Sequence, residues 1–132
     1  MEPSRILFLS GHPDDAHRLS KMLSSLPLAL DHAENLRQAR TRMQRTEYDV
    51  VLTEAALPDG SWLDALSLAR EDYRDPVLIV TDPQADARFW SQALNLGAYD
   101  LLAQPFYEPE VRRILSYACS RPRARQVSAA VV

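Results

Sequence analysis

Residues 48–60 read Tyr-Asp-Val-Val-Leu-Thr-Glu-Ala-Ala-Leu-Pro-Asp-Gly. The first six residues have the length and apolar character of a β-strand, and Glu54 is the residue that closes it. Similar short runs occupy residues 5–9, 28–32, 77–81 and 100–103. The runs at residues 5–9 and 77–81 are apolar without alternation, which is typical of strands buried on both faces. We therefore expect a sheet of five strands with helices on both sides.

Helical spacing of apolar residues follows each predicted strand. The five stripes are Ala16, Leu19, Leu23 and Leu26; Leu36, Ala39 and Met43; Trp62, Leu66, Ala69 and Tyr73; Phe89, Ala93 and Leu96; and Val111, Ile114, Leu115 and Ala118. Pro13 suits a first helical turn, Asn35 can cap the second helix, and Gly97 stands where the fourth should end. Strands that alternate with helices need crossover connections. We predict an α/β fold: one doubly wound, five-stranded parallel sheet with five helices.

Composition and charge set limits on the function. The chain has 132 residues, 46% hydrophobic and 25% charged, with a net charge of −3, so we expect one globular domain and no nucleic-acid partner. We assign residues 1–120 to this domain and 121–132 to a flexible basic tail or linker. No apolar stretch approaches the roughly 20 residues of a membrane helix, and the N-terminus lacks the layout of a secretion signal. A cytoplasmic protein without a membrane partner is expected.

Ligands of open parallel sheets bind beyond the carboxyl ends of the strands. Three segments that contribute to this edge resemble the receiver domains of two-component response regulators: residues 48–60, residues 76–81 (Pro-Val-Leu-Ile-Val-Thr) and residues 96–106 (Leu-Gly-Ala-Tyr-Asp-Leu-Leu-Ala-Gln-Pro-Phe). The resemblance extends over roughly residues 5–120. It implies the flavodoxin-like fold of the chemotaxis regulators and a signalling module of a two-component or phosphorelay system, which is not an enzyme.

The resemblance also implies that the phosphoacceptor site is degenerate. The family's Mg²⁺-binding acidic pair falls on Ser10 and Gly11, neither of which has a carboxylate, and the acceptor aspartate falls on Glu54. The extra methylene of glutamate displaces the carboxylate by about a bond length, which spoils an in-line attack. The clamping lysine falls on Gln104, while Thr81 matches the family. We predict no catalytic residue, no metal, no cofactor and no phosphotransfer: a pseudo-receiver.

Two interpretations of Glu54 remain open. Its negative charge can imitate a phosphorylated aspartate, or it can be a tolerated polar residue at a retired site, which we favour. In the second case its carboxylate is expected to be unpaired. Glu54→Gln should then leave partner binding unchanged and raise stability.

The family resemblance locates the surface for protein contacts on the fourth helix, fifth strand and fifth helix. The aromatic switch residue of the fifth strand is replaced by Leu101. The other expected interface residues are Gln92, Asn95, Asp100, Arg112, Arg113 and Tyr117. The partner would be a histidine kinase, an effector, another regulator or a second copy of the chain.

A competing motif follows the first strand. His12-Pro13-Asp14-Asp15 resembles the zinc motif of LmbE-like deacetylases of N-acetylated sugars, in which His12 and Asp15 would bind zinc and Asp14 would be the base. A catalytic zinc site needs three protein ligands, and the chain has no histidine beyond His32 to complete it. A zinc-dependent deacetylase-like fragment is therefore the alternative, and we predict no tight zinc binding.

Overall fold

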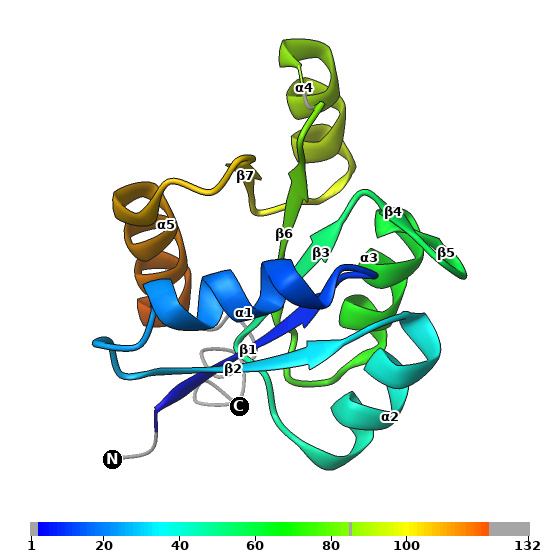
Figure 1. Ribbon diagram of the computed structural model, residues 1–132. Helices are drawn as coiled ribbons and strands as arrows, with labels where there is room; N and C mark the ends of the chain where they lie inside the picture. Colours follow the sequence, from blue (N-terminus) through cyan, green and yellow to red (C-terminus); the bar gives the residue numbers. More distant parts are fainter. Residues whose placement is uncertain (1–2, 85, 122–132) are drawn as a thin grey trace.

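The structure, a computed structural model, describes residues 3–84 and 86–121. Five parallel strands form one sheet in the order β2-β1-β3-β6-β7 (Figure 1). They are β1 (Ser4–Leu9), β2 (Leu28–Ala33), β3 (Val50–Glu54), β6 (Val77–Asp82) and β7 (Asp100–Ala103). The predicted α/β fold with its five-stranded parallel sheet is confirmed.

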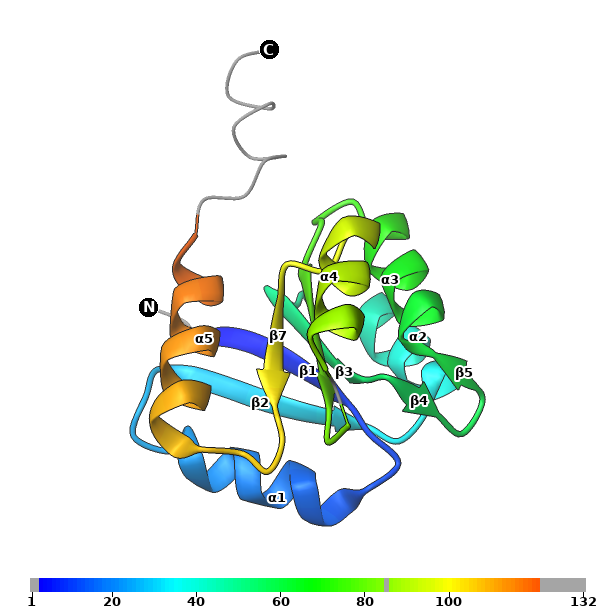
Figure 2. The same cartoon turned by 90° about the horizontal axis from the view of Figure 1, so that it is seen from above.

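Helices cover both faces of this sheet, as the view from above shows (Figure 2). One face carries α1 (Pro13–Met22) and α5 (Glu108–Ser120). The other carries α2 (Leu36–Arg45), α3 (Trp62–Glu71) and α4 (Ala87–Leu96). The sheet therefore divides the buried apolar residues into two clusters, one on each side.

The apolar strand β1 illustrates why both layers form. Ile6 and Phe8 pack in the cluster under α1 and α5, whereas Leu7 and Leu9 pack in the cluster under α2, α3 and α4. None of these four side chains is exposed. Because successive residues of a strand point to opposite faces, an unbroken apolar run is stable only between two layers of helices.

The predicted helix ends agree with the structure. Pro13 opens α1, the side chain of Asn35 accepts a 2.8 Å hydrogen bond from the Gln38 backbone at the start of α2, and Gly97 ends α4 with a φ of 126°. Positive φ is a conformation that glycine adopts without steric cost, which explains why the helix stops there.

Two members of the predicted apolar stripes are wrong. Tyr73 and Leu96, which we placed on buried faces of the third and fourth helices, are exposed. α3 ends at Glu71, so Tyr73 lies beyond the helix whose periodicity suggested its burial, and Leu96 is the last residue of α4. Helical spacing predicts a buried face only as long as the helix continues against the sheet.

A short hairpin was not predicted. β4 (Ala56–Leu57) and β5 (Gly60–Ser61) pair antiparallel in the loop between β3 and α3. Its turn residue Asp59 accepts hydrogen bonds from the backbone N–H groups of Leu36 and Arg37, at 2.8 and 3.2 Å. The loop after Glu54 is thereby attached to the start of α2.

The ends of the chain are only partly described. Residues 122–132, most of the predicted tail, lie outside the described residues. Arg121, which we assigned to the tail, donates a 3.3 Å hydrogen bond to the carbonyl of Asp75 and lies 5.8 Å from the ring of Tyr99. Within the described ranges no helix combines the length and apolar character that crossing a membrane requires.

Candidate functional site

The strand order reverses between β1 and β3, and ligands of such sheets bind at this point beyond the carboxyl ends. The loop of Ser10, Gly11 and His12 leaves β1 there, beside Glu54 at the end of β3. The parallel register pairs Leu9 with Thr53, so the residues that follow each strand become neighbours. The structure brings together the predicted positions Gly11 and Glu54 at this edge.

The carboxylate of Glu54 is the centre of the site. It accepts a 3.1 Å hydrogen bond from the backbone N–H of Gly11, and Nδ1 of His12 lies 3.1 and 3.0 Å from its two oxygens. The Glu54 side chain is only 9% exposed, whereas that of His12 is 70% exposed. The retired-site interpretation expected this carboxylate to be unpaired, and that expectation is wrong, because the imidazole of His12 contacts both of its oxygens.

The turn after β1 is held by Ser10. The buried Ser10 hydroxyl accepts a 2.9 Å hydrogen bond from the His12 backbone, and the Ser10 carbonyl lies 2.7 Å from Nε2 of His32. Gly11 approaches Pro58 so closely that a Cβ atom would lie 3.3 Å from its ring. At the two positions of the family's acidic pair, Ser10 therefore stabilises the turn after β1, and Gly11 allows the backbone to pack closely against Pro58.

The remaining predicted site residues form a second contact. The side-chain amide of Gln104 donates a 3.0 Å hydrogen bond to the hydroxyl of Thr81, which is fully buried. The only lysine, Lys21, is exposed in the last turn of α1, whereas His12 precedes the first turn of the same helix. Among the described residues, no lysine or arginine forms an ion pair with Glu54.

Asp15, at the start of α1, faces the same site. Ligand atoms of His12, Asp15 and Glu54 all lie within 4.8 Å of one another. Asp15 also lies 4.0 Å from Arg18, which is at the limit of an ion pair. Asp14, the predicted base of the deacetylase alternative, is exposed and is not part of this group.

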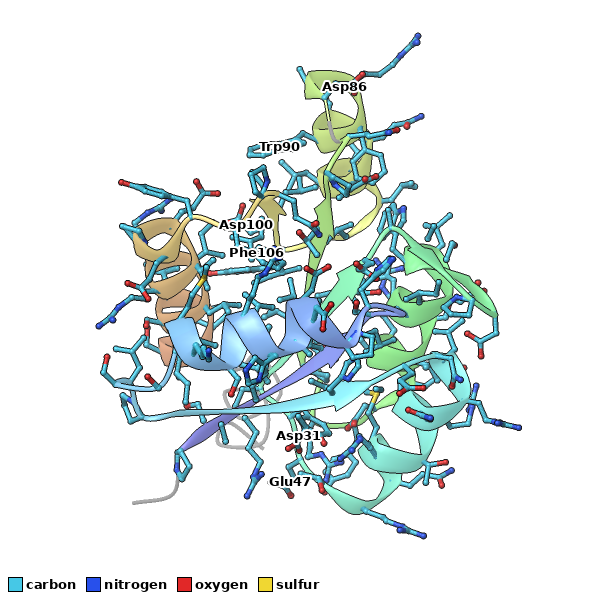
Figure 3. The ribbon with its side chains drawn as sticks, in the orientation of Figure 1. Asp31, Glu47, Asp86, Trp90, Asp100 and Phe106 are labelled. Atoms are coloured by element: carbon cyan, nitrogen blue, oxygen red, sulfur yellow. The ribbon has the colours of Figure 1, made fainter. Side chains whose placement is uncertain are left out.

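The predicted interface lies on a different side, formed by α4, β7 and α5. Gln92 and Asn95 are exposed on α4, Arg113 and Tyr117 are exposed on α5, and Asp100 and Arg112 are half-buried. Leu101 is buried in the core, so its side chain adds no surface to this face. Figure 3 shows Trp90 on α4 and Asp100 on β7, at the side of the molecule that α5 also borders.

Two further residues of α4, Trp90 and Leu94, were not among the predicted interface residues. Trp90 and Leu94 are exposed large apolar residues one turn apart on α4. Their spacing puts them on one side of the helix, beside the stripe that contains Phe89 and Ala93. An apolar pair off the buried stripe was the signal that could have revealed them.

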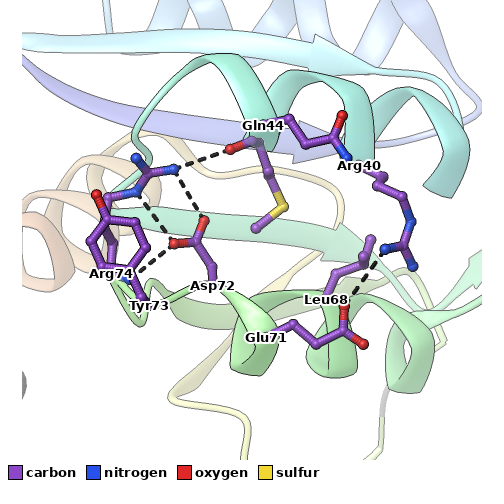
Figure 4. A pocket seen from close by; sticks show the side chains of 8 residues that line it. Arg40, Gln44, Leu68, Glu71, Asp72, Tyr73 and Arg74 are labelled. Atoms are coloured by element: carbon purple, nitrogen blue, oxygen red, sulfur yellow. Dashed lines mark hydrogen bonds and ion pairs between the residues drawn. The ribbon is translucent and has the colours of Figure 1, made fainter.

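A pocket at the opposite edge of the sheet is lined by residues whose contacts join two helices. It lies between α2 and the end of α3 (Figure 4). Arg74 donates a 3.0 Å hydrogen bond to the Met43 carbonyl and pairs with Asp72, while Arg40 lies 3.6 Å from Glu71. These contacts join the two helices, and no residue of the Glu54 site lines the pocket.

One family model matches most of this chain. The family model described as "Response regulator receiver domain" matches residues 6–116. The chain is 29% identical to the response regulator protein PilR of Pseudomonas aeruginosa, over 89% of the chain and 26% of that protein. The chain spans between 26% and 55% of the length of the curated relatives it matches.

Solved structures show the same fold. The receiver domain of an HD domain-containing protein from Pseudomonas fluorescens Pf-5 superimposes with a TM-score of 0.82 at 23% identity, covering 100% of this chain and 96% of that one. The beryllofluoride-activated NtrC4 receiver domain dimer has a TM-score of 0.79 at 23% identity, covering 87% and 95%. These likenesses concern the fold.

Proposed function

Because this chain belongs to the response regulator receiver domain family, we propose that it is a receiver of two-component signalling that works by protein contact, without phosphorylation. The zinc-dependent deacetylase alternative has no support from the similar proteins. Receiver domains are in general signalling modules, and we assign no enzymatic reaction to this one.

The observation that carries this proposal is the environment of Glu54. Its carboxylate is buried, accepts the Gly11 N–H, and is covered by the imidazole of His12. An incoming phosphodonor would have to displace that imidazole before reaching the carboxylate. Phosphoryl transfer depends on in-line positioning. A carboxylate that is covered by His12, and that the extra methylene of glutamate moves from the place of an aspartate carboxylate, is therefore a poor acceptor.

Charge supports the same conclusion. A phosphoryl group adds about −1.5 to −2 charges. Ser10 and Gly11 provide no carboxylate for Mg²⁺, and Gln104 provides a neutral amide whose hydrogen bond to Thr81 is already formed. Neutralisation of a phosphorylated state at this edge is therefore weak.

The partner surface that we propose is the α4–β7–α5 face, defined by Trp90, Leu94, Asp100, Arg112, Arg113 and Tyr117. Gln92 and Asn95 project from the opposite flank of α4, roughly 150° around the helix from Trp90 and Leu94, and are left out. Aromatic residues and arginine are enriched at protein interfaces, and two exposed apolar residues on one helix provide a core for such a contact. The simplest partner is a second copy of the chain, which the dimeric state of the NtrC4 receiver supports by analogy.

Labelling with a small phosphodonor tests the loss of phosphotransfer. The protein is incubated with acetyl phosphate and Mg²⁺, and its intact mass is measured. We expect no adduct on the wild type or on Glu54→Asp, because restoring the shorter side chain restores neither the acidic pair nor the lysine. A stoichiometric, base-labile phosphoryl adduct on the wild type that disappears in Glu54→Gln would overturn the proposal.

A further inference from the structure

We infer that His12, Asp15 and Glu54 form a binding site for one divalent first-row transition-metal ion, of the class of Zn²⁺ or Co²⁺. The ligand atoms would be Nδ1 of His12 and one carboxylate oxygen from each acid. They come from the β1–α1 loop, the first turn of α1 and the end of β3. This inference does not rest on the proposed function.

The distances suit a shared ion. Nδ1 of His12 lies 3.0 and 3.1 Å from the two oxygens of Glu54. Two atoms that are each about 2.1 Å from one metal lie roughly 3.0 to 3.4 Å apart, depending on the coordination angle. Asp15 lies within 4.8 Å of both, so a side-chain adjustment that weakens its 4.0 Å contact with Arg18 completes the set.

The burial of Glu54 gives the site its affinity. Its carboxylate is 9% exposed and has no lysine or arginine as an ion-pair partner among the described residues. A buried carboxylate is stabilised by a cation, and a divalent ion balances the two carboxylates that face it. His12 lies at the solvent side, so an ion can enter there, and water can fill its remaining positions.

The ligand types select the class of metal. Imidazole suits Zn²⁺, Co²⁺ and Ni²⁺, whereas Mg²⁺ prefers oxygen ligands and retains much of its water. The site therefore differs in ligands and in metal from the magnesium site that the family resemblance placed at Ser10 and Gly11. The sequence motif contains only two of the ligands, His12 and Asp15, which is why no metal was expected from it; the fold adds Glu54 as the third ligand.

Titration of the full chain without a histidine tag tests the inference. Protein treated with a chelator is titrated with Zn²⁺ by calorimetry and with Co²⁺ by visible absorption, in the presence of millimolar Mg²⁺. The ligand variants are His12→Ala, Asp15→Asn and Glu54→Gln. The matched controls are His17→Ala and Asp14→Asn, which alter an exposed histidine and an exposed aspartate of the same helix.

We expect one ion per chain, and a loss of affinity of about tenfold or more in each ligand variant. The controls should stay within about twofold of the wild type. Binding should also raise the melting temperature, since an ion that binds only the folded chain stabilises it. Because His12 and Asp15 lie at the surface side, their variants remain informative even when Glu54→Gln is poorly folded.

Three results would overturn the inference. One is the absence of saturable binding by either metal. Another is binding that His12→Ala leaves unchanged, and the third is a loss in His17→Ala as large as that in His12→Ala. A phosphorylated adduct in the labelling experiment would contradict the proposed function and leave the metal titration unaffected, so the two can fail separately.

Discussion

The side-chain amide of Gln104 donates a 3.0 Å hydrogen bond to the hydroxyl of Thr81, and this bond ties the end of β7 to the end of β6. The hydroxyl is fully buried, so the amide satisfies a group that water does not reach. A hydrogen bond of this kind contributes about 1 kcal/mol net, and an orphaned buried group costs more. The contact therefore stabilises the edge at which the family resemblance located a lysine.

The first prediction concerns this bond. Gln104→Ala should lower the free energy of unfolding by about 1 to 2 kcal/mol, because the Thr81 hydroxyl loses its donor. In a double-mutant cycle with Thr81→Val, denaturant unfolding should give a coupling of roughly 0.5 to 1.5 kcal/mol. Gln92→Ala, at an exposed position of α4, serves as the control and should change stability by less than about 0.5 kcal/mol. Additive effects would show that the bond contributes nothing.

The second prediction replaces the expected gain in stability on removal of the Glu54 charge. The carboxylate is paired with His12 and accepts the Gly11 N–H. Glu54→Gln should therefore lower the free energy of unfolding by about 1 kcal/mol, measured with a chelator present. A double-mutant cycle of Glu54→Gln with His12→Ala isolates the contribution of the Glu54–His12 pair. When the imidazole is already absent, Glu54→Gln should lower the free energy of unfolding only slightly further. A more stable Glu54→Gln protein would restore the original view of an unpaired charge.

The third prediction distinguishes the retired site from an imitation of phosphoaspartate. Glu54 is buried, and the partners of its carboxylate among the described residues, Gly11 and His12, lie in the loop before α1 and not on α4, β7 or α5. Self-association of Glu54→Gln, followed by sedimentation over a range of protein concentrations, should match that of the wild type within about twofold. A tenfold loss of association, equivalent to about 1.4 kcal/mol of coupling between site and surface, would favour the imitation.

The fourth prediction tests the α4–β7–α5 face. Leu94 on α4 is 47% exposed and Leu63 on α3 is 46% exposed. The two leucines are therefore almost equally exposed, but only Leu94 lies on the proposed face. Leu94→Ala should weaken self-association about fivefold or more, because truncation removes apolar contact area from the interface. Leu63→Ala should leave it unchanged. Equal effects of the two variants, or a wild type that stays monomeric at the highest concentrations, would contradict a dimer through this face.

The fifth prediction follows from Tyr48. Burial, and then its 2.7 Å hydrogen bond to Asp31 and the charge of that carboxylate, raise the pKa of Tyr48 to about 12. The unfolded chain loses this proton near pH 10, before the folded chain does. The contribution to stability is therefore complete below pH 10 and is lost as the pH rises from 10 to 12.

Comparison with Tyr48→Phe isolates this effect. The variant should be about 1 to 2 kcal/mol less stable at pH 7, because the hydrogen bond to a charged carboxylate is lost. The difference from the wild type should shrink as the pH rises from 10 to 12, as followed by urea unfolding. A constant difference over that range would show that the Tyr48 pKa is not raised.

The fold could be predicted from the sequence because its signals are local. Nearby residues specify each element: the unbroken apolar run specifies β1, the helical stripes specify the helices, and Asn35 and Gly97 mark helix ends. The alternation of strands and helices then leaves few possible topologies. Local signals also explain the errors. Periodicity alone does not reveal where a helix ends, so Tyr73 and Leu96 were placed inside the core.

Only part of the candidate site could be predicted from the sequence: the types of its residues, and not the contacts between them. Sequence determined that Ser10 and Gly11 have no carboxylate and that Gln104 has no cationic group, because this depends on residue type alone. The loss of acceptor chemistry that we propose from these residues is tested by the phosphodonor labelling. What surrounds Glu54 was decided by tertiary structure. His12 is 42 residues away along the chain, and it meets the carboxylate because β1 and β3 pair in parallel with Leu9 opposite Thr53. Contacts across a sheet depend on register, which is set by the packing of the whole core, and no local pattern encodes them.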